Sequence, residues 1–417
     1  MNVSEIRRIS YKLDEGILSD EIPVEELIRS LSSQNPEKIR TAIRALRLLV
    51  EKDVSLVDPE MIPVQVVLLN VNPPSLVEFL RLLEALGKQN TNILRDAIED
   101  LVELLEAEDI SVRVAACSAI ATLATEAPLS IYNYLDQLSS HVNDEDPRVR
   151  ISVFEALSAV VEEEYDSAVN IIEVAVDALD NGNEFVRDRA LMYLVSVVEQ
   201  SPNSIAGHAN HLLTPLNDPV TRHRGRAAYL VSELVQHDSD TVTELLESVV
   251  KLLNDPNLAT RQNATFTLLA WEHDNKSLDF PIKKIGKKLP ELLTTDVIAI
   301  QENAIYLTLK VIEREPNVVV NPDRVQTRIR ELQSDPAIDV PNHVFDSILK
   351  ELSINVTKSD DMSADDMLND KPTSDEVADR VTQTSVFGAS ASCGSCGAAL
   401  ESYDKLEFCP ECGTEQE

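Results

Sequence analysis

A spacing of 37 residues recurs through most of this chain of 417 residues. Segments that open with Asn or Asp and run on into a helix-like pattern begin 37 residues apart (72 − 35 = 37), at Asn35, Asn72, Asp109, Asp146 and Asn183. An arginine keeps the same step, at Arg113, Arg150, Arg187, Arg224 and Arg261. Self-similarity at a fixed period of this length indicates an array of repeated supersecondary units.

Each repeat is predicted to be a pair of helices, as residues 165–199 illustrate. Apolar residues recur at helical spacing in both halves: Ala168, Ile171, Ile172, Ala175, Val176 and Leu179, then Val186, Ala190, Leu191, Leu194 and Val198. Gly182 lies in the predicted turn, and Asn183 is placed to cap the second helix. Asn-Pro or Asp-Pro is predicted to open other second helices, because Pro suits the first helical position: Asn35, Asp146, Asp218 and Asp255.

A hairpin of this size buries its apolar face only by stacking on its neighbours, which produces a solenoid. The pattern Asp-Pro-x-Val-Arg-x-x-Ala in "DPRVRISV" and "DISVRVAA" resembles the HEAT repeat. The resemblance covers about residues 20–353. It implies an all-α, armadillo-like α-solenoid of about nine hairpins over residues 1–354, in which a capping carboxylate pairs with an arginine one repeat along. This reading makes the recurrent Asp and Arg structural, and Arg150→Ala is expected to loosen the stack.

Composition agrees with helices and restricts the partners. Aromatic residues make up only 4 % and there are ten glycines, which argues against a β-sandwich. The net charge of −35 repels nucleic acid and anionic lipid at long range. Such an acidic surface resembles haloarchaeal HEAT-repeat proteins, since at about 1 M salt the Debye length is only about 3 Å and self-repulsion is screened. An acidic scaffold from an ordinary cytoplasm is the alternative.

The C-terminal part has a different character. Residues 355–390, rich in Asp, Ser and Thr, are predicted to be a disordered acidic linker. Residues 391–417 hold two CxxC pairs separated by 12 residues (409 − 396 − 1 = 12): Cys393, Cys396, Cys409 and Cys412. Four thiolates at this spacing predict one tetrahedral, structural Zn²⁺ with no open position for catalysis; redox dithiols and an iron site are the alternatives. The stretch resembles the short zinc-ribbon family, which implies a small β fold.

Other candidate residues have simpler interpretations. His208 and His211 are three residues apart, as metal ligands can be, but two solvated histidines are the simpler interpretation. Cys117 lies among small apolar residues and is predicted to be a core residue. Two basic islands are predicted to be solvated helix faces with acidic neighbours: Arg222, Arg224 and Arg226, and Lys283, Lys284, Lys287 and Lys288.

The chain contains no Gly-rich phosphate loop and no GxSxG or HExxH motif, and no small-molecule substrate is indicated. The longest apolar run, "VQVVLLNV" at 64–71, is far too short to span a bilayer. No secretory signal is visible at the N-terminus, and paired CxxC motifs favour a cytoplasmic protein with reduced thiols.

The sequence therefore predicts a non-catalytic scaffold or adaptor that binds protein partners, with the tethered ribbon as a second contact. One alternative is a nucleic-acid- or chromatin-associated protein that uses the ribbon and the Lys283–Lys288 island; the acidic charge disfavours it. A lyase-like enzyme on a HEAT scaffold is the other. The sequence identifies neither the partner nor the oligomeric state.

Overall fold

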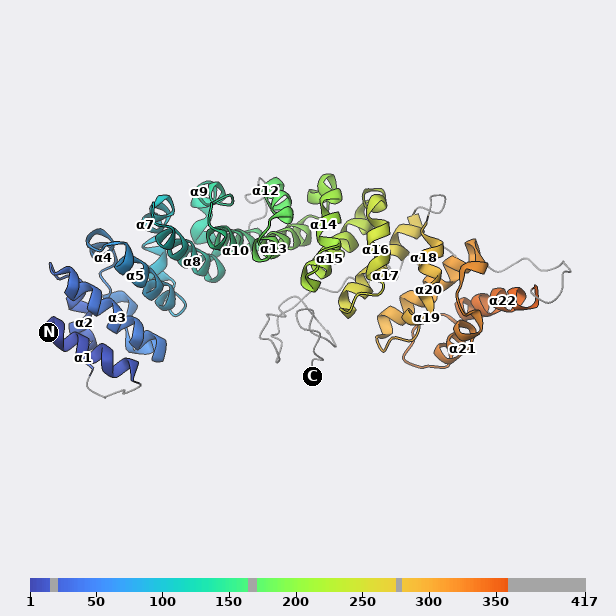
Figure 1. Cartoon of the computed structure of the whole chain (residues 1–417), viewed down its shortest axis with the longest axis horizontal. Coiled ribbons are helices and arrows are strands. Elements are labelled where there is room, and N and C mark those ends of the chain that lie inside the picture. Colours follow the sequence, from blue (N-terminus) through green and yellow to red (C-terminus); the bar gives the residue numbers. More distant parts are fainter. Residues whose placement is uncertain (16–21, 164–170, 275–279, 359–417) are drawn as a thin grey trace. The chain divides into compact units, whose positions relative to one another are not determined.

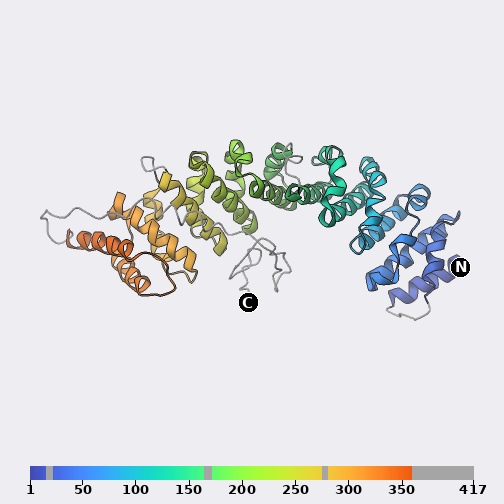
Figure 2. The ribbon, with the colours of Figure 1, turned by 180° about the vertical axis from the view of Figure 1, so that it is seen from behind.

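A computed structural model describes residues 1–15, 22–163, 171–274 and 280–358. These residues form helices and turns and contain no strand. The chain divides into two compact units, Met1–Gln200 and Ser201–Glu417. In each unit, short helical segments alternate with long helices, and successive long helices pack side by side (Figure 1). The view from behind shows the same succession inside each unit (Figure 2). The predicted all-α solenoid is therefore confirmed.

The first unit is a stack of six long helices, each in contact with the next. They are α1 (Val3–Asp14), α3 (Pro36–Lys52), α5 (Pro73–Gly87), α8 (Ile110–Glu126), α10 (Pro147–Glu163) and α13 (Glu184–Gln200). Shorter segments cover one edge: α2 (Val24–Leu31), η1 (Val54–Leu56), η2 (Pro59–Met61), α4 (Val64–Asn70), α6 (Asn92–Arg95), α7 (Ile98–Glu103), η3 (Leu104–Glu106), η4 (Pro128–Tyr134), α9 (Leu135–Ser140), α12 (Ile172–Asp177) and η6 (Ala178–Asp180). The first helix of the first pair, α2, is continuous; in the later pairs of this unit the first helix is broken into short α and 3₁₀ pieces, whereas the second is continuous.

The second unit repeats this plan with four long helices. They are α15 (Thr221–His237), α17 (Leu258–Asp274), α20 (Ile298–Arg314) and α22 (Asn342–Lys358). The shorter segments are η7 (Pro202–Leu212), α14 (Leu213–Leu216), η8 (Ser239–Leu245), α16 (Leu246–Leu252), α18 (Ile282–Gly286), α19 (Leu289–Leu292), η9 (Pro316–Val318) and α21 (Pro322–Gln333). In the described part of the chain, nine hairpins can be counted by their second helices, α3 to α22, which agrees with the predicted number.

The long helices follow the period of 37 closely. They begin 37 residues apart at Pro36, Pro73, Ile110, Pro147, Glu184, Thr221 and Leu258. The next, α20, begins at Ile298, after 40 residues (298 − 258 = 40). The prediction that Asp218-Pro219 and Asp255-Pro256 open helices is wrong: α15 and α17 begin three residues after these aspartates. Each Asp218 or Asp255 side chain instead accepts from the N–H two residues on, in an Asx turn before the helix.

The predicted caps are present at the regular positions. Asn35, Asp109, Asp146 and Asn183 each accept from the N–H two residues further along, at 2.8 to 3.0 Å. Asn72 accepts from Ser75, three residues on. The apolar stripe of residues 171–198 faces the core, because every described member of it is at most 5 % exposed. Ala168 lies outside the described residues.

The arginines join neighbouring repeats, but not through the capping residue as predicted. Arg113 donates from Nε to Asp144 Oδ2 at 3.0 Å, and Arg224 donates from Nε to Asp255 Oδ2 at 2.5 Å. Both aspartates lie 31 residues after their arginine and three residues before a long helix, so the capping position and the pairing position are separate. The Nη1 of Arg113 and of Arg224 also donates to the carbonyl six residues earlier, at 2.8 Å. The structural interpretation of the arginines is thus supported.

Arg150 differs from Arg113 and Arg224. Its Nη1 donates to the carbonyls of Asp144 and Glu145 in its own repeat. Its buried Nε has no hydrogen-bond partner within the described ranges, and the residue 31 positions on is Asn181 rather than Asp. Arg113 and Arg224 are therefore better sites than Arg150 for testing contacts between repeats.

The predicted end of the solenoid at residue 354 falls inside α22, which continues to Lys358. The rest of the predicted linker and the whole of residues 391–417 lie outside the described residues, so the linker and ribbon stay predictions.

Candidate interaction surface

The predicted zinc ligands Cys393, Cys396, Cys409 and Cys412 lie outside the described residues. Within the described ranges, no cluster of three or more His, Cys, Asp or Glu side chains is arranged to hold a metal ion. The rings of His208 and His211 are tilted, with centroids 6.2 Å apart, and have no such third ligand. This pair is consistent with its interpretation as two polar side chains.

Cys117 is a core residue, as predicted. It is 1 % exposed on α8. Burial disfavours the thiolate and raises the pKa of its thiol to about 12, so the thiol is protonated and unreactive at neutral pH.

The Lys283–Lys288 island lies on α18 and the turn after it, and acidic side chains surround part of it. Lys284 forms an ion pair with Glu247, and the Nζ of Lys283 lies 3.7 Å from a Glu315 carboxylate oxygen. These pairs agree with the predicted solvated face, and they reduce the positive charge available to a phosphate backbone.

The most exposed apolar surface lies on the segment from η1 to α4. Among the described residues, four of the eleven exposed large apolar side chains fall between residues 56 and 69: Leu56, Met61, Val66 and Leu69. Leu69 is 84 % exposed, more than any other. Helix α4 has seven residues and buries only Val67, because a short helix that is apolar all round turns one face to the core and the others to water. We call residues 56–69 the α4 surface.

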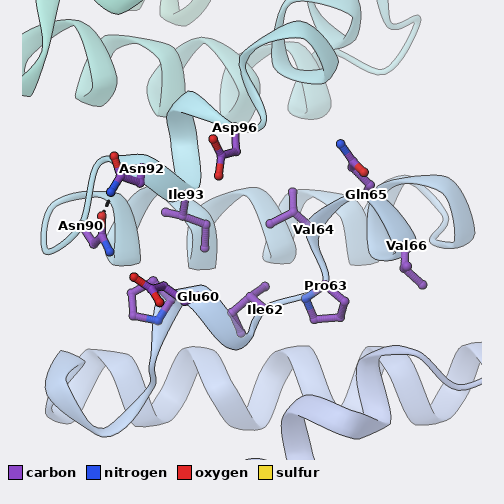
Figure 3. A pocket seen from close by; sticks show the side chains of 11 residues that line it. Glu60, Ile62, Pro63, Val64, Gln65, Val66, Asn90, Asn92, Ile93 and Asp96 are labelled. Atoms are coloured by element: carbon purple, nitrogen blue, oxygen red, sulfur yellow. Dashed lines mark hydrogen bonds between the residues drawn. The ribbon is translucent and has the colours of Figure 1, made fainter.

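A cavity of about 360 Å³ lies beside α4 (Figure 3). Ile62, Val64 and Ile93 form its apolar wall, with Ile62 and Ile93 each 7 % exposed. In the close-up their side chains face the same space, while Val66 points away from it. The volume is near the lower end of the range for ligand pockets, about 300–1,000 Å³, and suits one or two side chains of a bound peptide.

The rim of this cavity is polar and acidic. Glu60, Gln65, Asn90, Asn92 and Asp96 surround the apolar wall, and Glu60 and Asp96 are exposed (Figure 3). The Asn92 N–H donates to Asn90 Oδ1 at 3.1 Å, which fixes the turn before α6. An apolar centre with a polar rim is the usual anatomy of a protein-binding site.

Helix α6 forms one wall of the cavity because Gly87, at the end of α5, lets it approach. A Cβ at Gly87 would clash with the side chain of Leu94. Leu94 is fully buried, so α6 is anchored by its core side and presents Ile93 and Asp96 to the cavity.

The sequence analysis missed this surface, although a signal for it was available. The run "VQVVLLNV" is too short for a membrane segment, and within the described ranges no helix has the length and apolarity that a bilayer crossing requires. The run has no polar face at helical spacing, and a helix of that kind exposes apolar side chains wherever it lies at the surface, as α4 does.

These features define an α-helical solenoid with an exposed apolar surface. Residues 10–206 match the profile of the adaptin N-terminal region, an α-solenoid family. The match spans 197 residues (206 − 10 + 1 = 197), a little under half of the chain, and it includes the α4 surface. The similarity concerns this part of the chain.

Other comparisons add little. No curated protein matches the chain. Among solved structures, the crystal structure of an engineered protein from a structural genomics consortium matches with 19 % identity and a TM-score of 0.42, covering 60 % of this chain and 97 % of that one.

Proposed function

We propose that this chain is a non-catalytic, cytoplasmic scaffold or adaptor that binds a protein partner through the α4 surface and its cavity. The observation that carries the proposal is Leu69, a large apolar side chain left 84 % exposed on α4, the helix whose first residues line a preformed cavity. Monomeric proteins rarely gather exposed apolar side chains without an interaction to use them. The similarity of residues 10–206 to the adaptin N-terminal region supports a scaffold role.

The surroundings of the surface restrict the chemistry of the partner. Glu60 and Asp96 lie on the rim, and the whole chain carries a net charge of −35. A partner segment with apolar side chains flanked by Lys or Arg complements both features, because opposite charges steer the encounter and like charges prevent it. The apolar side chains fill the cavity and cover Leu69.

The test compares capture of partners by matched variants of the full chain. Leu69→Ser removes the exposed apolar side chain, and Leu129→Ser, at a residue 62 % exposed on η4 of the same unit, is the control. Burying a leucine contributes about 1.5–3 kcal/mol, so Leu69→Ser is expected to reduce binding of the captured partner at least tenfold. Asp96→Lys is expected to weaken the same partner, and Asp136→Lys on α9 is its control.

Both serine variants are expected to unfold at the temperature of the natural chain, since each replaces an exposed residue. A partner bound equally by the natural chain and by Leu69→Ser would contradict the proposal, as would a partner lost equally with Leu129→Ser.

The second contact in this proposal is a zinc ribbon at residues 391–417, tethered by the acidic segment before it. The spacing of the four cysteines supports one structural Zn²⁺. Native mass spectrometry of the full chain is expected to find one zinc. Iodoacetamide at pH 8 is expected to label four more cysteines after chelation, and Cys117 only after unfolding, because burial raises its pKa to about 12. An equal number of labelled thiols with and without chelator would contradict the ribbon.

The charge of −35 supports a further part of the proposal, adaptation to a cytoplasm of high salt as in salt-loving archaea. The midpoint of thermal unfolding is expected to rise steadily as KCl increases toward about 1 M, where the Debye length is about 3 Å. A midpoint that does not rise between low and molar salt would indicate an acidic scaffold from an ordinary cytoplasm.

A further inference from the structure

A second cavity, of about 460 Å³, lies in the second unit between the first turn of α17 and the residues that precede α20. Its lining includes Arg261, Asn257 and Ala259 at the start of α17, and Glu291, Thr295 and Asp296 before α20. Arg261 is the last arginine with the regular spacing of 37 residues, so its environment can be compared directly with those of Arg113 and Arg224.

Arg261 lacks the carboxylate that those two arginines bind. In their repeats the Asp stands 31 residues after the Arg, but 31 residues after Arg261 stands the buried Leu292. Counted from the helix instead, the equivalent position three residues before α20 is Thr295. Because three extra residues precede α20, the position 31 residues after the arginine and the position three residues before the helix no longer coincide. Neither of these two positions holds an acid. The Nε of Arg261 is buried and has no hydrogen-bond partner in the described part of the chain.

Neighbouring acids do not compensate for this burial. Asp255 already accepts from Arg224 Nε and from the Asn257 N–H. Desolvation lowers the pKa of Arg261, and it outweighs the opposing attraction of Asp255 and Glu291. A buried guanidinium donor without an acceptor is costly, and native structures usually satisfy such groups. Arg150 also has an unpaired Nε, but Asn181 fills the corresponding position there, whereas at Arg261 the position opens into a cavity.

We propose that this cavity binds a carboxylate side chain from an acidic peptide segment, which takes the place that Asp144 and Asp255 take in the complete repeats. The chemistry is a guanidinium–carboxylate pair with additional hydrogen bonds, the same pair that the solenoid already uses between repeats. The proposal is independent of the α4 surface, which lies in the other unit and takes a segment of opposite charge.

The chain carries such a segment directly after α22 in the sequence, and we assign it as the occupant. Residues 359–392 contain eight acids and two basic residues, a net charge of −6 (2 − 8 = −6). The segment follows α22, which packs on α20, and α20 begins at the cavity. A helix of 17 residues is about 25 Å long. For the linker that its composition predicts, a segment of 34 residues (392 − 359 + 1 = 34) has a reach of about 30–35 Å, which exceeds that length.

The test uses the full chain with a photocrosslinking residue, p-azidophenylalanine, in place of Ala259. Mass spectrometry then identifies the crosslinked peptides, and a mixture of isotopically heavy and light chains separates contacts within one chain from contacts between chains. Arg261→Met is the first variant. The second replaces Asp360, Asp361, Asp365 and Asp366 by Asn. The matched control carries the crosslinker at Arg222, the second residue of α15, beside the complete Arg224–Asp255 pair.

Crosslinks to residues 359–392 within one chain are expected, and they should fall at least fivefold in both variants and be at least fivefold weaker from position 222. Crosslinks only between heavy and light chains would support the same chemistry with a second copy as the source. Crosslinks that do not change in Arg261→Met, or none to any acidic segment, would overturn the proposal, since a cavity filled by water alone predicts the latter. Thermal unfolding confirms that each variant is folded, and these outcomes do not depend on Leu69.

Discussion

Arg224 and Arg261 occupy the same position in successive repeats, but only Arg224 has an aspartate partner in the next repeat. We call the contact region around each arginine, where two repeats meet, its junction. Arg224 donates to Asp255, whose side chain is almost completely buried, and to the Asp218 carbonyl. Arg261 has a buried Nε without an acceptor and faces a cavity. The same residue is therefore expected to stabilise one junction and to be dispensable, or costly, in the other. Repetition of a sequence motif does not repeat its energetic role when the partner is missing.

The largest expected effect comes from replacing each arginine by methionine, which keeps the aliphatic stem. Arg224→Met leaves the Asp255 carboxylate buried without its cation, and breaking such a pair costs about 3–5 kcal/mol. Arg261→Met removes a desolvated donor that lacks an acceptor and is expected to change stability by about 1 kcal/mol or less, or to increase it. Urea unfolding of both variants measures the difference.

Arg113→Met is the control for this comparison, because Arg113 repeats the complete arrangement in the first unit, with Asp144 at 3.0 Å. It is expected to behave as Arg224→Met does. Equal losses for Arg224→Met and Arg261→Met would show that the arginines act through packing alone.

Most of the fold was predictable because the signal repeats. The period of 37 residues places helix starts from Pro36 to Leu258, and the apolar stripes predict the buried faces. For the contacts between repeats, the residue types were predictable but the particular aspartate that pairs with each arginine was not. Asp and Arg were expected to meet, but Asp255 was assigned to a helix start because Pro follows it, although the period of 37 counted from Asn183 (183 + 74 = 257) places the cap two residues later, at Asn257.

The candidate sites were less predictable for physical reasons. Leu69 and Val64 belong to one apolar run, and the sequence does not tell which of them the short helix turns to solvent. The gap at Arg261 depends on three extra residues in a turn, which leave Thr295 where an acid stands in other repeats. Departures from a repeat are visible in the sequence, but the cavity that they open depends on packing.

The second prediction concerns a variant that supplies the carboxylate missing at the Arg261 junction. Thr295→Asp places a carboxylate three residues before α20, where Asp255 stands relative to α17. A charge-assisted hydrogen bond to Arg261 is expected to increase the free energy of unfolding by about 1.5 kcal/mol. Thr294→Asp, which adds the same charge at a neighbouring residue of the same cavity, is expected to give no gain. The substitution should also displace the acidic segment and reduce its crosslinks from position 259.

An equal gain from both aspartate variants would attribute the effect to general electrostatics rather than to the geometry of the junction. No gain from Thr295→Asp, with the chain folded, would mean that the longer turn holds residue 295 away from Arg261.

The smallest expected effect contrasts charged and uncharged caps within the first unit. Asp146 caps α10, and hydrogen bonds from Arg148 hold the pKa of its carboxyl below the usual value of 3.8. A carboxyl whose pKa is lowered by folding contributes stability that is present above pH 3.8 and is lost as the pH falls through the lower, folded value. Asn183 caps α13 with a neutral amide and has no such dependence.

Since a cap contributes about 1 kcal/mol, amide hydrogen exchange is expected to show the first turn of α10 losing protection below pH 3.8 by up to about fivefold. The first turn of α13 should keep its protection, and in Asp146→Asn the two helices should respond alike; equal acid sensitivity of α10 in both forms would exclude Asp146 as the titrating group.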